Sequence, residues 1–260
     1  MRRRLGQHFV ADPNLLEMIV RESGAGSEDV VLEVGGGAGA LSERLAPRVR
    51  HLHVIELDER LKPELEPAAA ERGNVDLIWA DALRIDLSAL RPTPLKVVSN
   101  LPYSIATPLI LKTIEELEAV DSWTLLVQRE IAERLRARPG SRAYGAPSVL
   151  VQLAAEVEIL RAVDRAVFTP RPRVDSALVA LRRRAPAAPE PVRRLVHEAF
   201  AHRRKSLARS LELAADPRQR DGRREEARYA LSEAGLREDA RAESLSPQEF
   251  VRLAGSLQAG

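Results

Sequence analysis

Cysteine is absent from this chain of 260 residues. Disulfides, thiolate metal sites and a cysteine nucleophile are therefore excluded together. Aromatic residues are also scarce, at 3%, so the core must be built mainly from Leu, Val, Ile and Ala. A chain without cysteine is compatible with a reducing compartment, and we expect a cytoplasmic location.

Long apolar runs are missing as well. No uncharged stretch reaches the roughly 20 residues that span a bilayer. The first nine residues, MRRRLGQHF, carry charge without a following apolar segment, which argues against a signal peptide. We therefore expect a soluble protein without a membrane partner. Its length allows one good-sized domain and a small second one.

Charge of one sign is concentrated in one part of the chain. Residues 182–228 hold 14 Lys and Arg against 7 Asp and Glu, so their formal charge of +7 leaves the remainder at −5. A basic segment joined to a mildly acidic body suggests a polyanionic partner. On charge alone, a solvated arginine-rich surface explains the pattern equally well.

Apolar, β-branched runs alternate with helix-length segments through the first two-thirds of the chain. That alternation is typical of an α/β fold with a parallel sheet. The last two runs are joined by a short Pro-rich connection, which predicts an antiparallel pair at the sheet edge. The expected strands are residues 30–34, 51–57, 75–80, 95–99, 124–128, 157–163 and 177–182.

Two local patterns mark boundaries. Asp12 is a good N-cap and Pro13 suits the first position of a helix, which predicts a helix starting there. Residues 185–191, APAAPEP, read as a linker, and the sequence beyond them is charged and helical in pattern. We therefore predict one domain over residues 1–185 and a second over 186–260.

A glycine-rich turn follows the first expected strand. The run from Gly35 to Gly39, GGGAG, lets the backbone approach a ligand, and a helix is expected from about Leu41. Glu56, 21 residues after Gly35, ends the next strand, where an acidic side chain can reach ribose hydroxyls. Asp81 ends the strand after that. The glycine spacing differs from that of dinucleotide binders and suits a nucleoside such as S-adenosylmethionine better. A tight turn with two strand-end carboxylates is the plain alternative.

The segment Asn100-Leu101-Pro102-Tyr103 follows the fourth expected strand. The Asn100 Oδ1 atom and a backbone carbonyl of the rigid Leu-Pro turn can hold the two N–H groups of an exocyclic amine and aim its lone pair. Tyr103 offers a face on which an extruded base can stack. The alternative is a strand-end Asn and a Pro-Tyr turn that only pack under the sheet.

The histidines predict no metal site. His51 and His53 alternate on one strand and share a face, yet the sequence shows no third ligand. His197 and His202 lie in the basic C-terminal part.

With these motifs assembled, the chain resembles the ribosomal RNA adenine N6,N6-dimethyltransferases, of the type that modifies two adjacent adenosines near the 3′ end of small-subunit (16S) rRNA. The likeness runs from Gly6-Gln7-His8-Phe9 to residues 203–207 and includes residues 134–145, with PGSRAYG, and residues 168–176, FTPRPRVDS.

The resemblance implies a Rossmann-like class I methyltransferase sheet of seven strands, the last pair antiparallel, with a small all-helical C-terminal domain. It implies S-adenosyl-L-methionine as the cofactor and no metal. The implied cofactor contacts are Gln7, His8, Val10, Gly35, Gly37, Glu56, Asp81, Ala82 and Asn100, and the implied catalytic loop is Asn100, Leu101, Pro102 and Tyr103. This chain departs from the family at His8, where Asn is usual, and at Gly36.

The implied partner is small-subunit ribosomal RNA in a 30S precursor particle, bound by a monomer, with no DNA. Unpaired adenosines are required because a paired base cannot present N6. Basic clusters at residues 2–4, 182–184, 193–194, 203–205 and 218–224 are candidate phosphate contacts. The alternatives are a large-subunit rRNA methyltransferase of the macrolide-resistance type, a non-catalytic assembly factor with the same fold, and a nicotinamide oxidoreductase.

Overall fold

The computed structural model describes residues 8–216, 220 and 222–259. The chain divides into two compact units. One comprises Met1–Ala132 and Ala155–Pro186, and the other Glu133–Ala154 and Ala187–Gly260. The division after Pro186 lies beside the expected linker. The single boundary expected there needs one correction, because the excursion Glu133–Ala154 belongs with the C-terminal helices.

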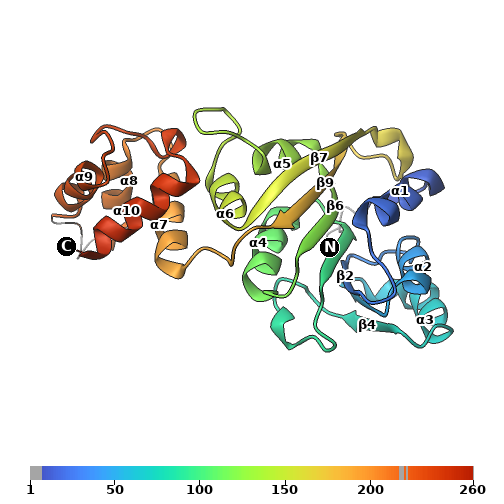
Figure 1. The fold of residues 1–260 in the computed structure, drawn as a ribbon. Helices are drawn as coiled ribbons and strands as arrows, with labels where there is room; N and C mark the ends of the chain where they lie inside the picture. The colour runs from blue at the N-terminus through green and yellow to red at the C-terminus, as the bar shows by residue number, and fades with distance from the viewer. Residues whose placement is uncertain (1–7, 217–219, 221, 260) are drawn as a thin grey trace. The chain divides into compact units, whose positions relative to one another are not determined.

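The first unit is built on a seven-stranded sheet, with neighbours in the order β4-β3-β2-β5-β6-β9-β7. The strands β2 to β6 pair in parallel, and β9 pairs antiparallel with both β6 and β7, which confirms the expected sheet. Figure 1 shows these strands as labelled arrows. Their bounds are β2 Val30–Val34, β3 His51–Glu56, β4 Val75–Trp79, β5 Lys96–Asn100, β6 Ser122–Gln128, β7 Ala155–Val163 and β9 Ser176–Arg183.

Helices precede the parallel strands, lie between most of them and follow the last one. Helix α1, Pro13–Ser23, starts as expected, because the Asp12 side chain accepts a hydrogen bond from the Asn14 N–H at 2.9 Å. The expected helix after the glycine turn is only one turn long: α2 covers Ser42–Leu45 and continues as a 3₁₀ segment, Ala46–Arg48. The other helices are α3 Lys62–Ala70, α4 Ala106–Glu116 and α5 Arg129–Leu135. Further 3₁₀ segments are Glu59–Leu61, Leu87–Ala89 and Arg165–Val167.

The core of this unit is aliphatic, as the scarcity of aromatic residues requires. Every residue of β2 is buried, which is the pattern of a central parallel strand covered on both faces. Leu15, Leu16 and Ile19 of α1 pack in the same cluster as Val31 of β2 and Val54 of β3. This packing holds the strand ends, and the loops that follow them, in place.

A second, two-stranded sheet joins distant parts of the sequence. Strand β1, Phe9–Val10, pairs antiparallel with β8, Phe168–Thr169. The Ala11 N–H also donates to the Val167 carbonyl at 2.8 Å. The segment beginning at His8 is thereby tied to the FTPRP segment.

The second unit is helical, as expected for the C-terminal part. Its helices are α6 Ala146–Ala154, α7 Glu190–Ala201, α8 Leu207–Ala214, α9 Arg223–Glu233 and α10 Pro247–Ala259, with a 3₁₀ segment at Ala242–Ser244. Tyr144 explains why the excursion belongs here. Its ring is fully buried, its hydroxyl donates to the Leu245 carbonyl at 2.8 Å, and the Gly140 N–H donates to the Glu243 carbonyl at 2.6 Å. Among the described residues, no helix has both the length and the apolar character needed to cross a membrane.

Candidate active site

A cleft with a volume of about 150 Å³ lies at the carboxyl ends of β2, β3, β4 and β5 and is open to solvent. Ten of the residues that the sequence predicted for the site line this cleft. They are His8, Gly35, Gly37, Glu56, Asp81, Ala82, Asn100, Leu101, Pro102 and Tyr103. The strands are parallel, so their carboxyl ends share one edge of the sheet and their loops converge there.

The glycine turn forms one side of the cleft. Gly35 and Gly37 have φ of 84° and 57°, in the left-handed region that suits glycine. A Cβ on Gly35 would lie 3.1 Å from Pro102 Cδ, so glycine there lets the 100–103 loop approach the turn closely. A Cβ on Gly37 would lie 3.0 Å from the Phe9 ring. Phe9 also lines the cleft, a role that sequence reasoning missed.

Glu56 is held rigidly by backbone donors. Its Oε1 accepts the N–H groups of Leu57 and Asp58, both at 2.8 Å, and its Oε2 accepts the N–H of Gly37 at 2.9 Å. A carboxylate oxygen has two lone-pair sites, so Oε1 is filled by its two backbone donors, whereas Oε2 can accept one further hydrogen bond from a ligand in the cleft. The glycine turn and the carboxylate therefore position each other. The helix expected from about Leu41 is only one turn long, so its dipole adds little to this site.

Asp81 and Ala82 form the next part of the wall. Asp81 is about one-third exposed, at 32% of its side chain, and its Oδ1 accepts the Leu83 N–H at 3.0 Å. Its Oδ2 lies 3.4 Å from Arg84 Nε. Ala82 is buried and supplies apolar surface. A partly exposed carboxylate beside apolar wall suits a flat heterocycle with an amino group.

The Asn100–Tyr103 loop forms the opposite wall. The Asn100 Nδ2 donates to the His8 carbonyl at 3.1 Å, which leaves Oδ1 as the acceptor of that amide. Leu101 is buried, and its N–H donates to the Leu126 carbonyl at 3.1 Å. The Pro102 carbonyl accepts the Ile105 N–H at 3.1 Å, so Leu101 provides the second candidate backbone acceptor. The hydrogen bond from Leu101 to Leu126 of β6 therefore holds the loop against the sheet.

Tyr103 is anchored across the cleft. Its hydroxyl is hydrogen-bonded to Ser176 Oγ at 2.7 Å, at the start of β9. Burial raises the pKa of Tyr103 above its ordinary value, so the ring stays neutral. Its centroid lies 5.4 Å from that of His8, with the planes tilted by 35°. Sequence reasoning gave Ser176 no role, since the contact joins residues far apart in the chain.

His8 has one ring nitrogen already committed. Its Nδ1 lies 2.7 Å from the Pro170 carbonyl, which can only accept, so Nδ1 carries the hydrogen. In the neutral ring, Nε2 is then an acceptor. Donation from Nε2 to a ligand carboxylate requires the imidazolium form.

Two other expected contacts fall elsewhere. The Val10 side chain is buried in the core cluster with Leu16 and Phe168 instead of lining the cleft, because β1 turns alternate side chains to opposite faces. The cofactor contact expected at Val10 stays a prediction. Gln7 lies outside the described residues, as do Arg2, Arg3 and Arg4.

Glu33 is a buried acid that sequence reasoning noted only as the residue before the turn. The Ser42 Oγ donates to its Oε2 at 2.6 Å. Burial raises the pKa of Glu33 to about 8, the Ser42 hydrogen bond lowers it in part, and the Glu56 charge raises it further. Glu33 is therefore a neutral, hydrogen-bonded core residue at neutral pH.

Two members of the expected basic clusters have structural partners. The Arg183 guanidinium donates to the Ile114 and Leu117 carbonyls at the end of α4, at 3.3 and 3.0 Å, and lies 4.9 Å from the Trp123 ring centroid. Arg203 donates to Glu243 at 2.9 Å and to the Arg142 carbonyl at 2.7 Å.

The remaining clusters divide between paired and exposed cations. Arg184 pairs with Glu156, and Arg223 lies 3.7 Å from Glu198. Arg204 and Lys205 are exposed in the turn before α8. They are the better candidates for contacts with a polyanion. Arg218 lies outside the described residues.

The chain was compared with known proteins. The family model described as ribosomal RNA adenine dimethylase matches residues 1–259. A protein named ribosomal RNA small subunit methyltransferase A from Rubrobacter xylanophilus is 44% identical over 254 residues, covering 97% of this chain and 93% of its own. The protein of the same name from Thermobifida fusca is 42% identical, covering 96% of this chain and 88% of its own.

Solved structures show the same fold. A dimethyladenosine transferase from Plasmodium falciparum matches with a TM-score of 0.77 at 24% identity, over 95% of this chain and 96% of its own. The 23S rRNA methyltransferase ErmE matches with a TM-score of 0.67 at 28% identity, over 96% and 99%. The agreement in sequence and in fold extends over both units, and the chain therefore belongs to the ribosomal RNA adenine dimethylase family.

Proposed function

We propose that this protein transfers methyl groups from S-adenosylmethionine to N6 of two adjacent adenosines in the 3′-terminal hairpin of small-subunit rRNA. The observation that carries the proposal is the placement of Asn100–Tyr103 in the wall of the same cleft as the glycine turn, Glu56 and Asp81. The small-subunit target rests on the relatives' names, since both proteins described above are small subunit methyltransferases. Ribosome assembly in the cytoplasm is the setting in which such a substrate occurs.

The cleft residues fit the proposed cofactor by their chemistry. The Glu56 carboxylate is held in place, and its Oε2 keeps the capacity to accept a hydrogen bond from a ribose hydroxyl. Asp81 can accept from an adenine amino group, and Ile55, Leu57 and Ala82 provide apolar walls for the ring. When bound, S-adenosylmethionine supplies an electrophilic methyl group on a sulfonium.

Catalysis by this chain then consists of positioning. An exocyclic amine is a weak nucleophile because its lone pair is delocalised into the purine. The Asn100 Oδ1 and the Leu101 carbonyl accept its two N–H bonds, which directs the lone pair toward the methyl group. The cofactor would supply the methyl group to N6 held in this way, and the proton lost from N6 would pass to solvent. The Tyr103 ring stacks on the extruded base.

The RNA must be held by contacts outside the cleft. Phosphate contacts give affinity and register but little sequence information. Arg204 and Lys205 are exposed and lie in the basic segment, so we assign them to RNA backbone binding. We expect the enzyme to act as a monomer on an assembling 30S particle.

The deciding experiment is methyl transfer from labelled S-adenosylmethionine to 30S particles that lack this modification. Asn100→Ala should reduce transfer by at least about a hundredfold, since the amine is no longer oriented. Asn14→Ala, at an exposed position of α1, is the matched control and should retain full activity. Circular dichroism spectra that match the wild type show that each variant is folded. Nuclease mapping should place dimethyladenosine in the 3′-terminal hairpin.

Other outcomes identify the rival functions. Label in large-subunit RNA alone would assign the chain to the macrolide-resistance type. The similarity in fold to the 23S rRNA methyltransferase ErmE is the reason to test this alternative. Cofactor binding without transfer to either RNA would indicate a non-catalytic assembly factor. Binding of a nicotinamide cofactor in place of S-adenosylmethionine would indicate an oxidoreductase.

A further inference from the structure

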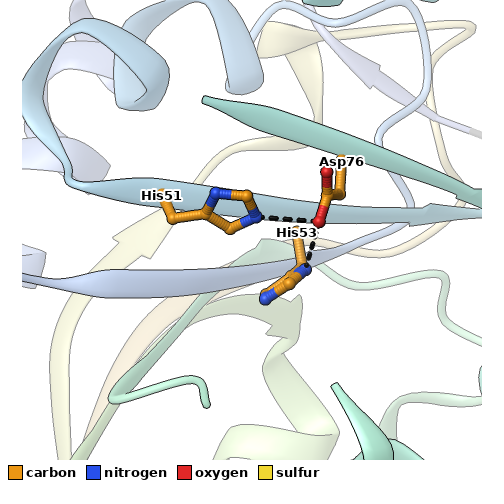
Figure 2. A group of neighbouring side chains, drawn as sticks. All are labelled: His51, His53 and Asp76. Atoms are coloured by element: carbon orange, nitrogen blue, oxygen red, sulfur yellow. Dashed lines mark hydrogen bonds and ion pairs between the residues drawn. The ribbon is translucent and has the colours of Figure 1, made fainter. Parts of the chain in front are cut away.

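Three side chains with metal-ligand chemistry meet on strands β3 and β4, away from the proposed active site. Figure 2 shows His51, His53 and Asp76 converging. Oδ2 of Asp76 lies 2.9 Å from His51 Nε2 and 3.5 Å from His53 Nδ1. The sequence offered no third ligand for the histidine pair. Asp76 corrects that expectation, because the parallel register places it directly beside His53.

His53 has an unusual hydrogen-bonding state. Its Nε2 lies 2.8 Å from the Pro92 carbonyl, which only accepts, so Nε2 carries the hydrogen. Nδ1 of the neutral ring then carries no hydrogen and can only accept a hydrogen bond or bind a cation. This atom is buried without a hydrogen-bond partner, in a side chain that is only 1% exposed, and it faces the Asp76 carboxylate.

Two acceptors that face each other across 3.5 Å repel unless a proton or a cation lies between them. A cation would satisfy both atoms and would also bind His51 Nε2, in place of the hydrogen bond that joins His51 Nε2 to Asp76 Oδ2 at 2.9 Å. The Nε2–H donation to the Pro92 carbonyl is the outer hydrogen bond that metal-ligating histidines typically make.

We propose that His51, His53 and Asp76 form a binding site for a divalent transition-metal ion, with Zn²⁺ as the best fit. Two imidazoles and one carboxylate match zinc, whereas Mg²⁺ and Ca²⁺ prefer oxygen ligands alone. Ligands of a tetrahedral zinc ion lie roughly 3.3 Å apart, given Zn–N and Zn–O bonds of about 2.0–2.1 Å. The two distances to Asp76 Oδ2, 2.9 and 3.5 Å, lie on either side of that value.

The position of the site indicates a structural role. β4 is an edge strand of the sheet, and an ion shared by β3 and β4 would fasten that edge. The Asp76 side chain is 53% exposed, so water can complete the coordination. Glu56, the cleft residue on β3, lies at the other end of the strand. The site is thus independent of the proposed methyl transfer.

The test is Zn²⁺ binding by isothermal titration calorimetry, on protein freed of any polyhistidine tag and dialysed against a chelator. The wild type should bind one equivalent with micromolar or tighter affinity. Asp76→Asn and His51→Gln should each weaken binding more than about tenfold, since each removes one of three ligands. His197→Gln is the matched control, because His197 is exposed on α7 and distant in sequence from the site, and it should bind normally.

Either of two results would overturn the proposal: equal Zn²⁺ affinity in wild type and Asp76→Asn, or loss of binding in His197→Gln. If a site variant fails to fold, the histidine ring resonances of the wild type decide the question. Zn²⁺ should shift the ¹⁵N resonance of His53 Nδ1 while the Nε2 proton persists. An unchanged His53 ring at saturating Zn²⁺ would also refute the site.

Discussion

Glu33→Gln should stabilise the first unit at high pH and leave it nearly unchanged at low pH. The ordinary pKa of this carboxyl, 4.5, is raised to about 8 by burial. Between these values the folded chain keeps a proton that the unfolded chain has lost, so the free energy of unfolding falls as pH rises. The slope is about 1.4 kcal/mol per pH unit, which amounts to roughly 5 kcal/mol over the whole interval. Glutamine is neutral at every pH, keeps the shape and can still accept from Ser42.

The assay is urea unfolding at pH 5, 6.5 and 8, followed by tryptophan fluorescence. Both tryptophans, Trp79 and Trp123, lie in strands of the first unit and report on its unfolding. The stability gain from Glu33→Gln should be within about 1 kcal/mol of zero at pH 5 and several kcal/mol at pH 8. Glu43→Gln, at an exposed position beside Ser42, is the matched control and should give a small difference that is constant with pH. A gain that is independent of pH for Glu33→Gln would refute the reasoning.

Two further predictions concern the RNA contacts and the cleft. The double variant Arg204→Glu, Lys205→Glu should weaken rRNA binding in filter assays and leave cofactor affinity unchanged. The slope of log binding constant against log salt concentration should become shallower by up to about two, and unaltered RNA affinity would exclude these residues as phosphate contacts. Tyr103→Phe and Ser176→Ala should each slow methyl transfer by roughly five- to tenfold, since either removes the same hydrogen bond. The double variant should be no slower than either single one, and additive losses would show that the two side chains act separately.

Much of the first unit could be predicted from local patterns. The strand Val30–Val34 agrees with the expected range, and the N-cap at Asp12 has the expected hydrogen bond. Glu56 and Asp81 could be placed in one cleft because they end neighbouring parallel strands, whose carboxyl ends must share an edge. These predictions depend on residues close together in sequence or on a rule of sheet topology.

Other features depended on packing between distant segments. The Tyr144 hydroxyl contacts the Leu245 carbonyl, and this contact moves residues 133–154 into the helical unit, although the composition changes only near residue 185. Arg183 appeared as one of a basic run, yet the end of α4 takes its guanidinium.

The sequence by itself determined the strand positions of the first half, the glycine turn and the chemical types present in the cleft. Only the tertiary structure decided which atoms of those residues remain available. The Pro170 carbonyl sets the tautomer of His8, the Ser176 hydroxyl holds Tyr103, and the register of β3 and β4 brings Asp76 to His53. Each of these contacts depends on direction and distance between segments that a local pattern does not encode, because a hydrogen bond forms only when donor and acceptor meet within about 3 Å at a suitable angle.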